Sequence, residues 1–329
     1  MTLRAATPRL SEIHAPIHDR LDRVVDEIRR IVTSDFAPVD AVNQYLLKIR
    51  GKLFRPGLTL LSDALCGTPR PEAVTLAAVV ELVHLATLVH DDAVDHSVLR
   101  RGMPTVNALW SHQVAVIMGD YLYSRSIIEL ARMGQMEPIR VLASAANAMT
   151  VGEMRQLSSH DALDFSEDDY YRLIDSKTAS LMSAACELGA ITGAPRYRDR
   201  LAAYGRELGL AFQIADDLLD YTADPGVTGK PTGLDLREHK VTLPLIAALP
   251  ALSAAERRGV DAFFRDPEPT DGSIAAVIAL VRRHGGLDYA REQALACAAR
   301  AAECLEGLPE GPALEALRDH IAYAVERRR

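Results

Sequence analysis

The sequence Asp-Asp-Ala-Val-Asp at residues 91–95 ends an apolar, helix-periodic stretch that begins at Leu76. A second copy, Asp-Asp-Leu-Leu-Asp at 216–220, ends another such stretch that begins at Leu208. Positions i and i+4 share one face of a helix, so the first and last aspartates of each copy converge. Like charges at that spacing destabilise an exposed helix by about 0.2–0.5 kcal/mol per pair, and by more where water is scarce. Because this like-charge repulsion occurs twice beside apolar surface, we predict that a bound cation relieves it.

The composition of the two motifs favours a hard cation. Their carboxylates have no neighbouring cysteines or clustered histidines. Mg²⁺ held by a few carboxylates typically completes its shell with water and phosphate. The alternative is that both motifs are simply solvated acidic helix ends. A single motif would leave that alternative open, but the matched pair argues strongly against it.

The overall composition predicts a helical protein and argues against a nucleic-acid binder. Hydrophobic residues make up 48% of the 329 residues, Ala and Leu are abundant, and β-branched alternation is scarce. That balance favours helices over sheets. The net charge of −8 argues against a nucleic-acid binder, which normally carries a basic surface. With one Trp and 5% aromatic residues, the chain also has few side chains on which bases could stack.

The cysteines and the apolar segments predict a soluble, cytoplasmic protein without a transmembrane segment. The four cysteines are widely scattered and show no CxxC or zinc spacing, so we expect free thiols. The N-terminus lacks the apolar core of a signal peptide. The most apolar stretch, residues 73–89, is interrupted by Glu81 and His84, and we expect it to fall short of a membrane span.

Helical periodicity extends over most of the chain, and no long Gly/Ser/Pro linker divides it. We therefore expect one all-α domain over residues 1–329, a large helical bundle in which the two acidic motifs face each other across a central cavity. The predicted helices are Ser11–Val32, a segment from Pro56 through Leu65, the first acid-bearing helix from Pro71, Val106–Met133, Pro138–Ser158, Glu167–Thr192, Arg198–Tyr221, Leu243–Leu249, Ala254–Phe264, Ser273–His284, Leu287–Leu305 and Pro312–Arg327.

Basic residues near the helix junctions suggest a diphosphate ligand. Arg offers phosphate a planar donor fork and Lys a point charge. The turn-rich segment 222–240 follows the second motif and predicts a lid. Each cation taken alone is a candidate for a solvated surface residue, and the placement beside the acidic motifs favours the phosphate role. The candidates are Lys52, Arg55, Arg100, Arg101, Lys177 with Thr178, Lys230, Lys240, Gln213 three residues before Asp216, and His84 two turns before Asp91.

Together these residues resemble the trans-prenyltransferases, the polyprenyl (isoprenyl) diphosphate synthase family, of the medium- or long-chain type. The motifs follow the family order over residues 51–244, and such an ordered series is far more specific than one aspartate-rich motif. They are Gly-Lys-x-x-Arg-Pro at 51–56, Glu-Leu-Val-His at 81–84, His-Asp-Asp-Ala-Val-Asp at 90–95, Arg-Arg-Gly at 100–102, Gly-Asp-Tyr-Leu at 119–122, Lys-Thr-Ala-Ser-Leu at 177–181, Phe-Gln-Ile-Ala-Asp-Asp-Leu-Leu-Asp at 212–220, and the segment from Gly-Lys-Pro-Thr-Gly to Thr-Leu-Pro at 229–244.

The resemblance implies a homodimeric all-α enzyme and assigns a role to each motif. About two to three Mg²⁺ ions would bind per site, by analogy with other diphosphate-transferring metal sites. The implied metal ligands are Asp91, Asp95, Asp216 and Asp220, with Asp92 and Asp217 in support. The implied contacts to an allylic diphosphate are Arg100, Lys177, Thr178, Gln213, Lys230 and Lys240. Those to isopentenyl diphosphate are Lys52, Arg55, His84 and Arg101.

The implied reaction is the Mg²⁺-dependent 1′-4 condensation of isopentenyl diphosphate with an allylic prenyl diphosphate, giving a longer all-trans product. Breaking the allylic C–O bond leaves a carbocation and a diphosphate, so the site must stabilise the departing charge and exclude water. Ala86 and Thr87, five and four residues before Asp91, are small, whereas short-chain members often carry aromatic rings there. They would leave a deep tunnel and favour a medium or long product.

Four alternatives stay open at this point. A short-chain synthase would share every motif, and Ile127 and Ile128 could still close the tunnel. A terpene cyclase would usually need aromatic walls, and this chain has few aromatics. A non-catalytic synthase subunit would be expected to lose acidic motifs or phosphate-binding cations. A metal-binding scaffold protein is the fourth, and a diphosphate-binding titration with and without Mg²⁺ would separate it from the enzymes.

Overall fold

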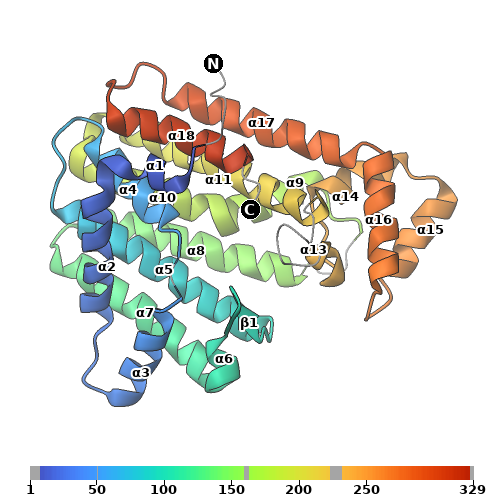
Figure 1. Cartoon of the computed structure of the whole chain (residues 1–329), viewed down its shortest axis with the longest axis horizontal. Helices are drawn as coiled ribbons and strands as arrows, with labels where there is room; N and C mark the ends of the chain where they lie inside the picture. The colour runs from blue at the N-terminus through green and yellow to red at the C-terminus, as the bar shows by residue number, and fades with distance from the viewer. Residues whose placement is uncertain (1–7, 50, 159–162, 223–231, 327–329) are drawn as a thin grey trace.

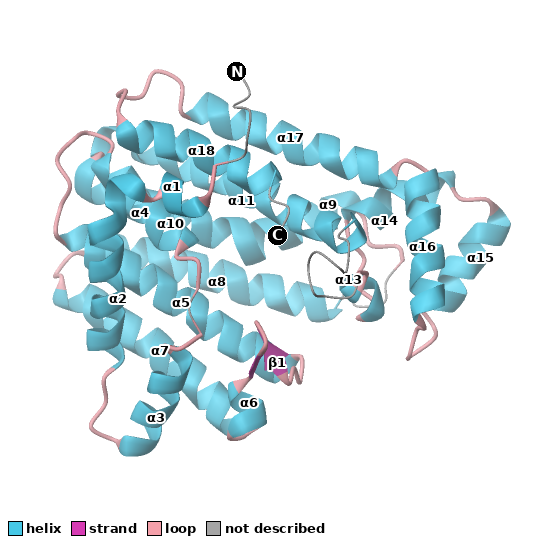
Figure 2. Cartoon of the chain, in the orientation of Figure 1, coloured by secondary structure: helices cyan, strands magenta, loops and turns pink. Residues whose placement is uncertain are grey.

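The computed structural model describes residues 8–49, 51–158, 163–222 and 232–326, and within these ranges the chain is almost entirely helical (Figures 1 and 2). This agrees with the predicted all-α class. The α-helices are α1 (Leu10–Ile13), α2 (His18–Val32), α3 (Ala37–Leu46), α4 (Phe54–Ala64), α5 (Glu72–Val94), α6 (Val106–Leu109), α7 (His112–Arg132), α8 (Met136–Ser158), α9 (Glu167–Ile174), α10 (Ser180–Gly193), α11 (Arg198–Thr222), α13 (Leu234–Arg237), α14 (Leu243–Ala248), α15 (Ala254–Phe263), α16 (Asp271–Arg283), α17 (Gly286–Cys304) and α18 (Pro312–Glu326).

Helix α5, which carries the first acidic motif, runs through the middle of the bundle (Figure 1). Its 23 residues are apolar nearly all round, as expected of a helix covered on every side. It packs against α2, α4, α7 and α10. Contrary to the expectation from Glu81 and His84, α5 is long and apolar enough to span a membrane, but 61% of its most apolar window is buried inside the protein. Its apolar character is therefore that of a core helix.

Helix α11, which carries the second acidic motif, approaches α10 through glycines. A Cβ atom on Gly205 would lie 2.5 Å from the carbonyl oxygen of Met182, and one on Gly209 would lie 2.6 Å from Cα of Ala179. Only a residue without a side chain allows backbones to meet this closely. Because α10 also contacts α5, the close packing draws the two acid-bearing helices into one bundle.

A small antiparallel hairpin follows the first acidic motif. Strand β1 (Leu99–Arg100) pairs with β2 (Met103–Pro104), and Arg100 lies opposite Met103. The two turn residues, Arg101 and Gly102, have φ angles of 51° and 75°. Turns with two left-handed residues match the twist of paired strands, and the glycine makes the second position inexpensive. The hairpin fixes Arg100 beside the first acidic motif.

Three predicted helices are interrupted, the first two for a local reason. Pro16 lacks an amide hydrogen, so the first helix divides into α1, a 3₁₀ turn (Ala15–Ile17) and α2. The side chain of Ser111 accepts a hydrogen bond from the amide of Val114, which caps α7 and separates it from α6. Between α9 and α10 the chain adopts one π-helical turn, Asp175–Ala179.

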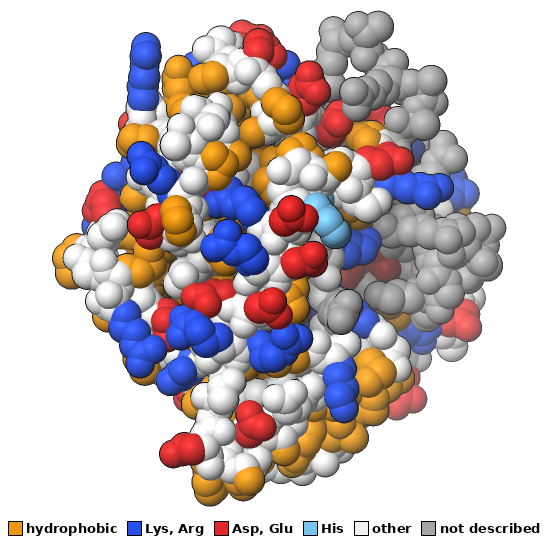
Figure 3. All heavy atoms as spheres, turned by 60° about the vertical axis from the view of Figure 1, so that its left-hand side comes forward, with side chains coloured by type: hydrophobic (Ala, Val, Ile, Leu, Met, Phe, Trp, Pro, Cys, Tyr) orange, Lys and Arg blue, Asp and Glu red, His pale blue; other side chains and the backbone are white. Residues whose placement is uncertain are grey.

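The surface mixes charge types. Lysine and arginine side chains lie among aspartates and glutamates over the face that Figure 3 presents. Such interspersed charges keep the potential of this face from building up in one sign. All four cysteines are free thiols, as predicted, and Cys186 and Cys297 are buried.

The first and last helices of the chain, α1 and α18, meet at a buried pair of histidines. His14, at the end of α1, lies 3.3 Å from His320 of α18, measured between the two Nε2 atoms. The Nδ1 atom of His320 lies 2.8 Å from the carbonyl oxygen of Ala316, which it can reach only as a donor. Burial lowers the pKa of His14 to about 4 and that of His320 to about 3. Both rings are therefore neutral in the folded protein at neutral pH.

This pair predicts a loss of stability in acid. Unfolding returns each ring to an ordinary pKa near 6.5, so the unfolded chain binds more protons between pH 6.5 and 4 and the free energy of unfolding falls as pH falls. We expect His14→Gln, which keeps a hydrogen-bonding side chain, to reduce that slope by up to about 1.4 kcal/mol per pH unit. Urea unfolding at pH 7, 6, 5 and 4.5 measures it. The exposed His18 supplies the control His18→Gln, and equal slopes for His14→Gln and the parent would contradict the assignment.

Candidate active site

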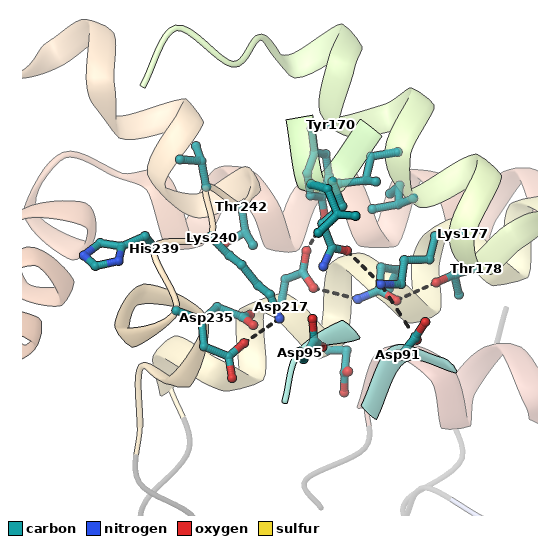
Figure 4. Close-up of a pocket in the computed structure, with 18 of the residues that line it drawn as sticks. Asp91, Asp95, Tyr170, Lys177, Thr178, Asp217, Asp235, His239, Lys240 and Thr242 are labelled. Carbon is teal, nitrogen blue, oxygen red and sulfur yellow. Dashed lines mark hydrogen bonds and ion pairs between the residues drawn. The ribbon is translucent and has the colours of Figure 1, made fainter. Parts of the chain in front are cut away.

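The two acidic motifs line opposite sides of one cavity of about 780 Å³ (Figure 4). Asp91 and Asp95 come from the end of α5, and Asp216 and Asp217 come from α11. Segments that lie far apart in sequence complete the wall. The other lining residues are Leu88, Val94, Arg100, Gln156, Leu157, Phe165, Tyr170, Leu173, Ile174, Lys177, Thr178, Gln213, Asp235, Arg237, Glu238, His239, Lys240, Val241 and Thr242.

Lys177 lies above Asp91 and is held there by α8. Its Nζ atom is 2.6 Å from Glu153 Oε2, 2.8 Å from Gln156 Oε1 and 3.9 Å from Asp91 Oδ2. The π-helical turn that bears Lys177 packs closely on α8, since a Cβ atom on Gly152 would lie 3.0 Å from the Lys177 amide nitrogen. Such wide turns often occur at functional sites. Here the turn directs Lys177 and Thr178 into the cavity.

Asp91 is poised between charged and neutral forms. Burial raises its pKa to about 6, and Glu153 and Asp95 add to this rise, while Lys177 and Arg100 oppose it. A carboxylate in this environment gains from any further positive charge that enters the cavity. Asp95 lies one turn along at the exposed end of the helix.

Asp92 has a different role from its neighbours. It is buried, does not line the cavity, and accepts two hydrogen bonds from Arg100 Nε, at 2.8 and 2.9 Å. Burial raises the pKa of Asp92 and Arg100 opposes the rise. Asp92 therefore anchors the hairpin and orients Arg100, which does line the cavity.

A chain of hydrogen bonds fixes the second motif. Asp217 accepts from the hydroxyl of Tyr170 at 2.6 Å and from the amide of Gln213 at 2.7 Å, and Gln213 in turn accepts from Thr178 at 2.8 Å. Burial raises the pKa of Asp217 to about 7, although both hydrogen bonds lower it. Asp216, by contrast, is exposed toward the cavity.

Asp220 faces the start of α13 and not the cavity. Its two carboxylate oxygens each accept a backbone amide, from Leu234 and from Asp235, at 3.0 Å. Asp235 takes a place in the cavity wall in its stead. Burial raises the pKa of Asp235 well above its ordinary value, and Asp217 and Asp220 add to the rise.

The predicted lid is described only in its second half. Lys230 lies outside the described residues. Lys240 enters the cavity from the segment after α13, and Figure 4 shows its side chain directed toward Asp95 and Asp217. Burial alone would lower the pKa of Lys240, but Glu238, which lies 2.5 Å from Nζ, together with Asp235 and Asp95, raises it. The ammonium group therefore stays charged in the cavity.

The other predicted basic residues form a second cluster beside the cavity. Arg55, His84 and Glu81 are half-buried and interact electrostatically, and Arg101 acts on all three. Burial lowers the pKa of Arg55 to about 10 and that of His84 well below its ordinary value, and it raises the pKa of Glu81. The Nε atom of Arg55 has no hydrogen-bond partner. A buried donor without a partner suits an anionic ligand.

Lys52 marks the outer edge of this second cluster. It is exposed, and its Nζ atom lies 3.3 Å from the hydroxyl of Tyr323 in α18. A small cavity of about 30 Å³ adjoins the main one, since Leu88 and Arg100 line both, and Arg101 of the second cluster also lines the small cavity. The two basic groups are thus separate but adjacent.

The donor set of the cavity fits a hard cation that arrives with its ligand. Within the described ranges, no three acidic, histidine or cysteine side chains are close enough to hold an ion by themselves. Carboxylates nonetheless line two facing walls, and burial leaves Asp91 and Asp217 short of positive charge. Mg²⁺ favours few protein carboxylates with phosphate oxygens and water completing its shell. The residues fit that ion.

The proposed chain-length residues lie below the cavity. Ala86 is buried at 3% exposure, and the hydroxyl of Thr87 donates to the carbonyl oxygen of His84 at 2.8 Å. Neither belongs to the cavity wall, whereas Leu88, the next residue, does. Their influence on product length stays a prediction.

Sequence reasoning missed several residues of the site: Glu153, Gln156, Tyr170 and Asp235, and it left Glu81 undecided. Glu153 and Gln156 are three residues apart and share one helical face, which was the available signal. Tyr170 and Asp235 carry no comparable local signal, because packing alone brings them to Asp217.

Comparisons with known proteins agree with the motifs. Residues 37–281 match the family model described as polyprenyl synthetase. An all-trans-nonaprenyl-diphosphate synthase (geranyl-diphosphate specific) from Rhodobacter capsulatus is 38% identical over 320 residues, which cover 96% of this chain and 97% of that protein.

Two solved structures share the fold over almost the whole chain. A decaprenyl diphosphate synthase from Rhodobacter capsulatus has a TM-score of 0.92 and 40% identity, covering 98% of this chain and all of that one. A polyprenyl synthase from Caulobacter crescentus, complexed with calcium and isoprenyl diphosphate, has a TM-score of 0.92 and 32% identity, covering 99% of this chain and 100% of that one.

Proposed function

The chain belongs to the polyprenyl synthetase family, and on that premise we propose how its cavity carries out the family's reaction. The enzyme lengthens an allylic prenyl diphosphate with isopentenyl diphosphate to a polyprenyl diphosphate of medium to long chain. The meeting of two aspartate motifs across one cavity, with lysine and arginine side chains between them, carries the proposal. Facing carboxylates with cations between them suit a diphosphate that arrives with Mg²⁺.

Asp91, Asp95 and Asp216 are the carboxylates that we propose as Mg²⁺ ligands, because they line the cavity from its two sides. Asp220, the fourth predicted ligand, already accepts two backbone amides. Bound here, Mg²⁺ would neutralise the allylic diphosphate and stabilise it as a leaving group. About two to three ions per site remain the expectation for this kind of transfer.

The cavity's own cations would hold the allylic diphosphate. Lys177, Lys240 and Arg100 line the wall, and Thr178 and Gln213 extend it with polar groups. Lys177 is oriented in advance by Glu153 and Gln156, so little side-chain entropy is lost when a phosphate oxygen binds it. Charge-assisted hydrogen bonds from these groups strengthen as the diphosphate takes on the charge of the broken bond.

The reaction then follows from charge. The C–O bond of the allylic diphosphate breaks, its electron pair leaves with the diphosphate oxygen, and an allylic cation remains. Apolar side chains in the same wall, among them Leu88, Phe165 and Leu173, keep water from the cation. The double bond of isopentenyl diphosphate attacks C1, a new C–C bond forms, and the displaced proton goes to the released diphosphate.

The second basic cluster is our proposed site for isopentenyl diphosphate. Arg55 and His84 lie half-buried there, Arg101 acts on both electrostatically, and the exposed Lys52 lies at the edge. The unpartnered Nε of Arg55 supports the assignment, because a diphosphate oxygen would satisfy it. Glu81 partly balances the positive charge of Arg55, which reduces the cost of half-burying that guanidinium in the free protein.

We propose that the protein is a cytoplasmic homodimer that pairs through an apolar stripe on α7 and α8. Ile117 and Ile128, three turns apart on α7, are 60% and 41% exposed, and Met154 on α8 is 60% exposed. Large exposed apolar groups aligned on one face commonly mark a protein interface. Sedimentation should give about twice the 35.9 kDa chain mass for the parent and a single chain for Ile117→Asp, and a monomeric parent would contradict the proposal.

Removing one carboxylate from either side should stop condensation without unfolding the protein. We expect Asp91→Ala and Asp216→Ala each to lower kcat by at least about a hundredfold. Each variant removes a proposed Mg²⁺ ligand, and Mg²⁺ would stabilise the negative charge that develops on the diphosphate in the transition state. Incorporation of labelled isopentenyl diphosphate measures it, with circular dichroism as the folding check. Asp288→Ala, at an exposed position on α17, is the matched control. Full turnover in either site variant would refute the assignment.

A larger side chain at residue 86 should shorten the product. Ala86 lies five residues before Asp91 on α5, so Ala86→Phe would place a ring where the growing chain is expected to descend. Chromatography of the products after incubation with several primers and Mg²⁺ measures the ladder. Ala86→Ser is the control of similar size, and Thr87→Phe replaces Ala86→Phe if overpacking prevents folding. An unchanged ladder would place the length limit elsewhere.

A further inference from the structure

Asp220 binds the protein's own backbone by three hydrogen bonds. Its carboxylate oxygens accept the amides of Leu234 and Asp235, each at 3.0 Å. Its carbonyl oxygen accepts the amide of Gly233 at 2.8 Å. Gly233 has a φ of 78°, a backbone conformation that favours glycine, and it precedes the first residue of α13. Asp220 thus supplies the acceptors that the first amides of this short helix lack.

The anchored helix leads directly to two groups of the cavity. Asp235 lies in the first turn of α13 and lines the cavity. Its carbonyl oxygen accepts the amide of Lys240 at 2.7 Å, which fixes the segment that carries the Lys240 side chain. Leu236 is fully buried beneath the turn, so the helix rests on the core. Figure 4 shows Asp235 and Lys240 side by side at one end of the cavity.

The cavity wall therefore uses a carboxylate from α13 where the motif's own third aspartate turns away. Asp216, Asp217 and Asp235 line the cavity on this side, and Asp220 does not. Each oxygen of Asp220 keeps a further lone pair, but the two amides hold the carboxylate toward α13 and outside the cavity lining, so binding a metal ion in the cavity would require rearrangement.

We infer that Asp220 is a positioning residue, which anchors α13 so that Asp235 and Lys240 face the bound diphosphate. This inference rests on the proposed function for the identity of the diphosphate, but the anchor itself belongs to the free protein. Asp220 acts through Asp235 and Lys240, and Asp216 acts on the ligand directly. The two aspartates of one motif then differ in what their loss does.

Amide-resolved hydrogen exchange on the full-length, metal-free protein tests the anchor. Asp220→Ala should speed exchange at Leu234 and Asp235 by at least about tenfold, because both amides lose a charge-assisted acceptor. Asp220→Asn, which keeps one acceptor oxygen, should show an intermediate increase. Asp216→Asn is the matched control from the same motif and should leave both amides at the parent rate. Near-ultraviolet circular dichroism verifies the fold, and Asp220→Asn carries the test if Asp220→Ala fails to fold.

Kinetics separate anchoring from metal binding. The Mg²⁺ concentration for half-maximal activity should rise in Asp216→Asn and stay at the parent value in Asp220→Asn, whose KM for the allylic diphosphate should rise instead. Parent-like amide exchange in both Asp220 variants would overturn the inference. So would a rise in the Mg²⁺ requirement of Asp220→Asn equal to that of Asp216→Asn. Absence of condensation by the parent would count against the proposed function alone, since the exchange measurement needs no substrate.

Discussion

Carboxylates that face one another across a single cavity are the constraint on which the rest of the site depends. Burial is the first cause of the raised pKa of Asp91, Asp217 and Asp235, and each further acid in the cavity adds to it. A cavity of this kind costs free energy when empty of positive charge. The protein limits the cost with fixed cations, Lys177 and Lys240 within the wall and Arg100 at its rim. The negative charge that these cations leave uncompensated favours the binding of a ligand that brings a metal ion.

The scaffold holds this arrangement with close backbone contacts. Gly205 and Gly209 let α11 lie against α10, and Gly152 lets α8 lie against the π-helical turn of Lys177. Close packing leaves few alternative side-chain arrangements, so the acids cannot move apart to reduce their repulsion. Hydrogen bonds then divide the labour within each motif. Asp92 and Asp220 serve the protein's own structure, and the remaining aspartates line the cavity.

Most of the helices and the two acidic motifs could be predicted from the sequence, because hydrophobic periodicity and the spacing of like charges are local properties of the chain. The i to i+4 rule correctly grouped Asp91 with Asp95, which both line the cavity, but it also paired Asp216 with Asp220, and only Asp216 lines it. The π-helical turn at 175–179 could not, since the same residues suit an ordinary helix and packing against α8 decides the outcome. Tyr170 is 47 residues from Asp217, and that contact exists only once α9 and α11 have docked. The outward turn of Asp220 likewise depends on where α13 lies.

The contact between His14 and His320 joins residues 306 positions apart in the chain. Helix α1 therefore emerges from the ribosome long before α18, the helix that it contacts, exists. At ordinary translation rates the interval is about 15 to 60 s. During that time α1 lacks its contact with α18, whereas α2 can already pack on α4, α5 and α7, so the closure between the two ends of the chain is a late step that follows synthesis of the last helix.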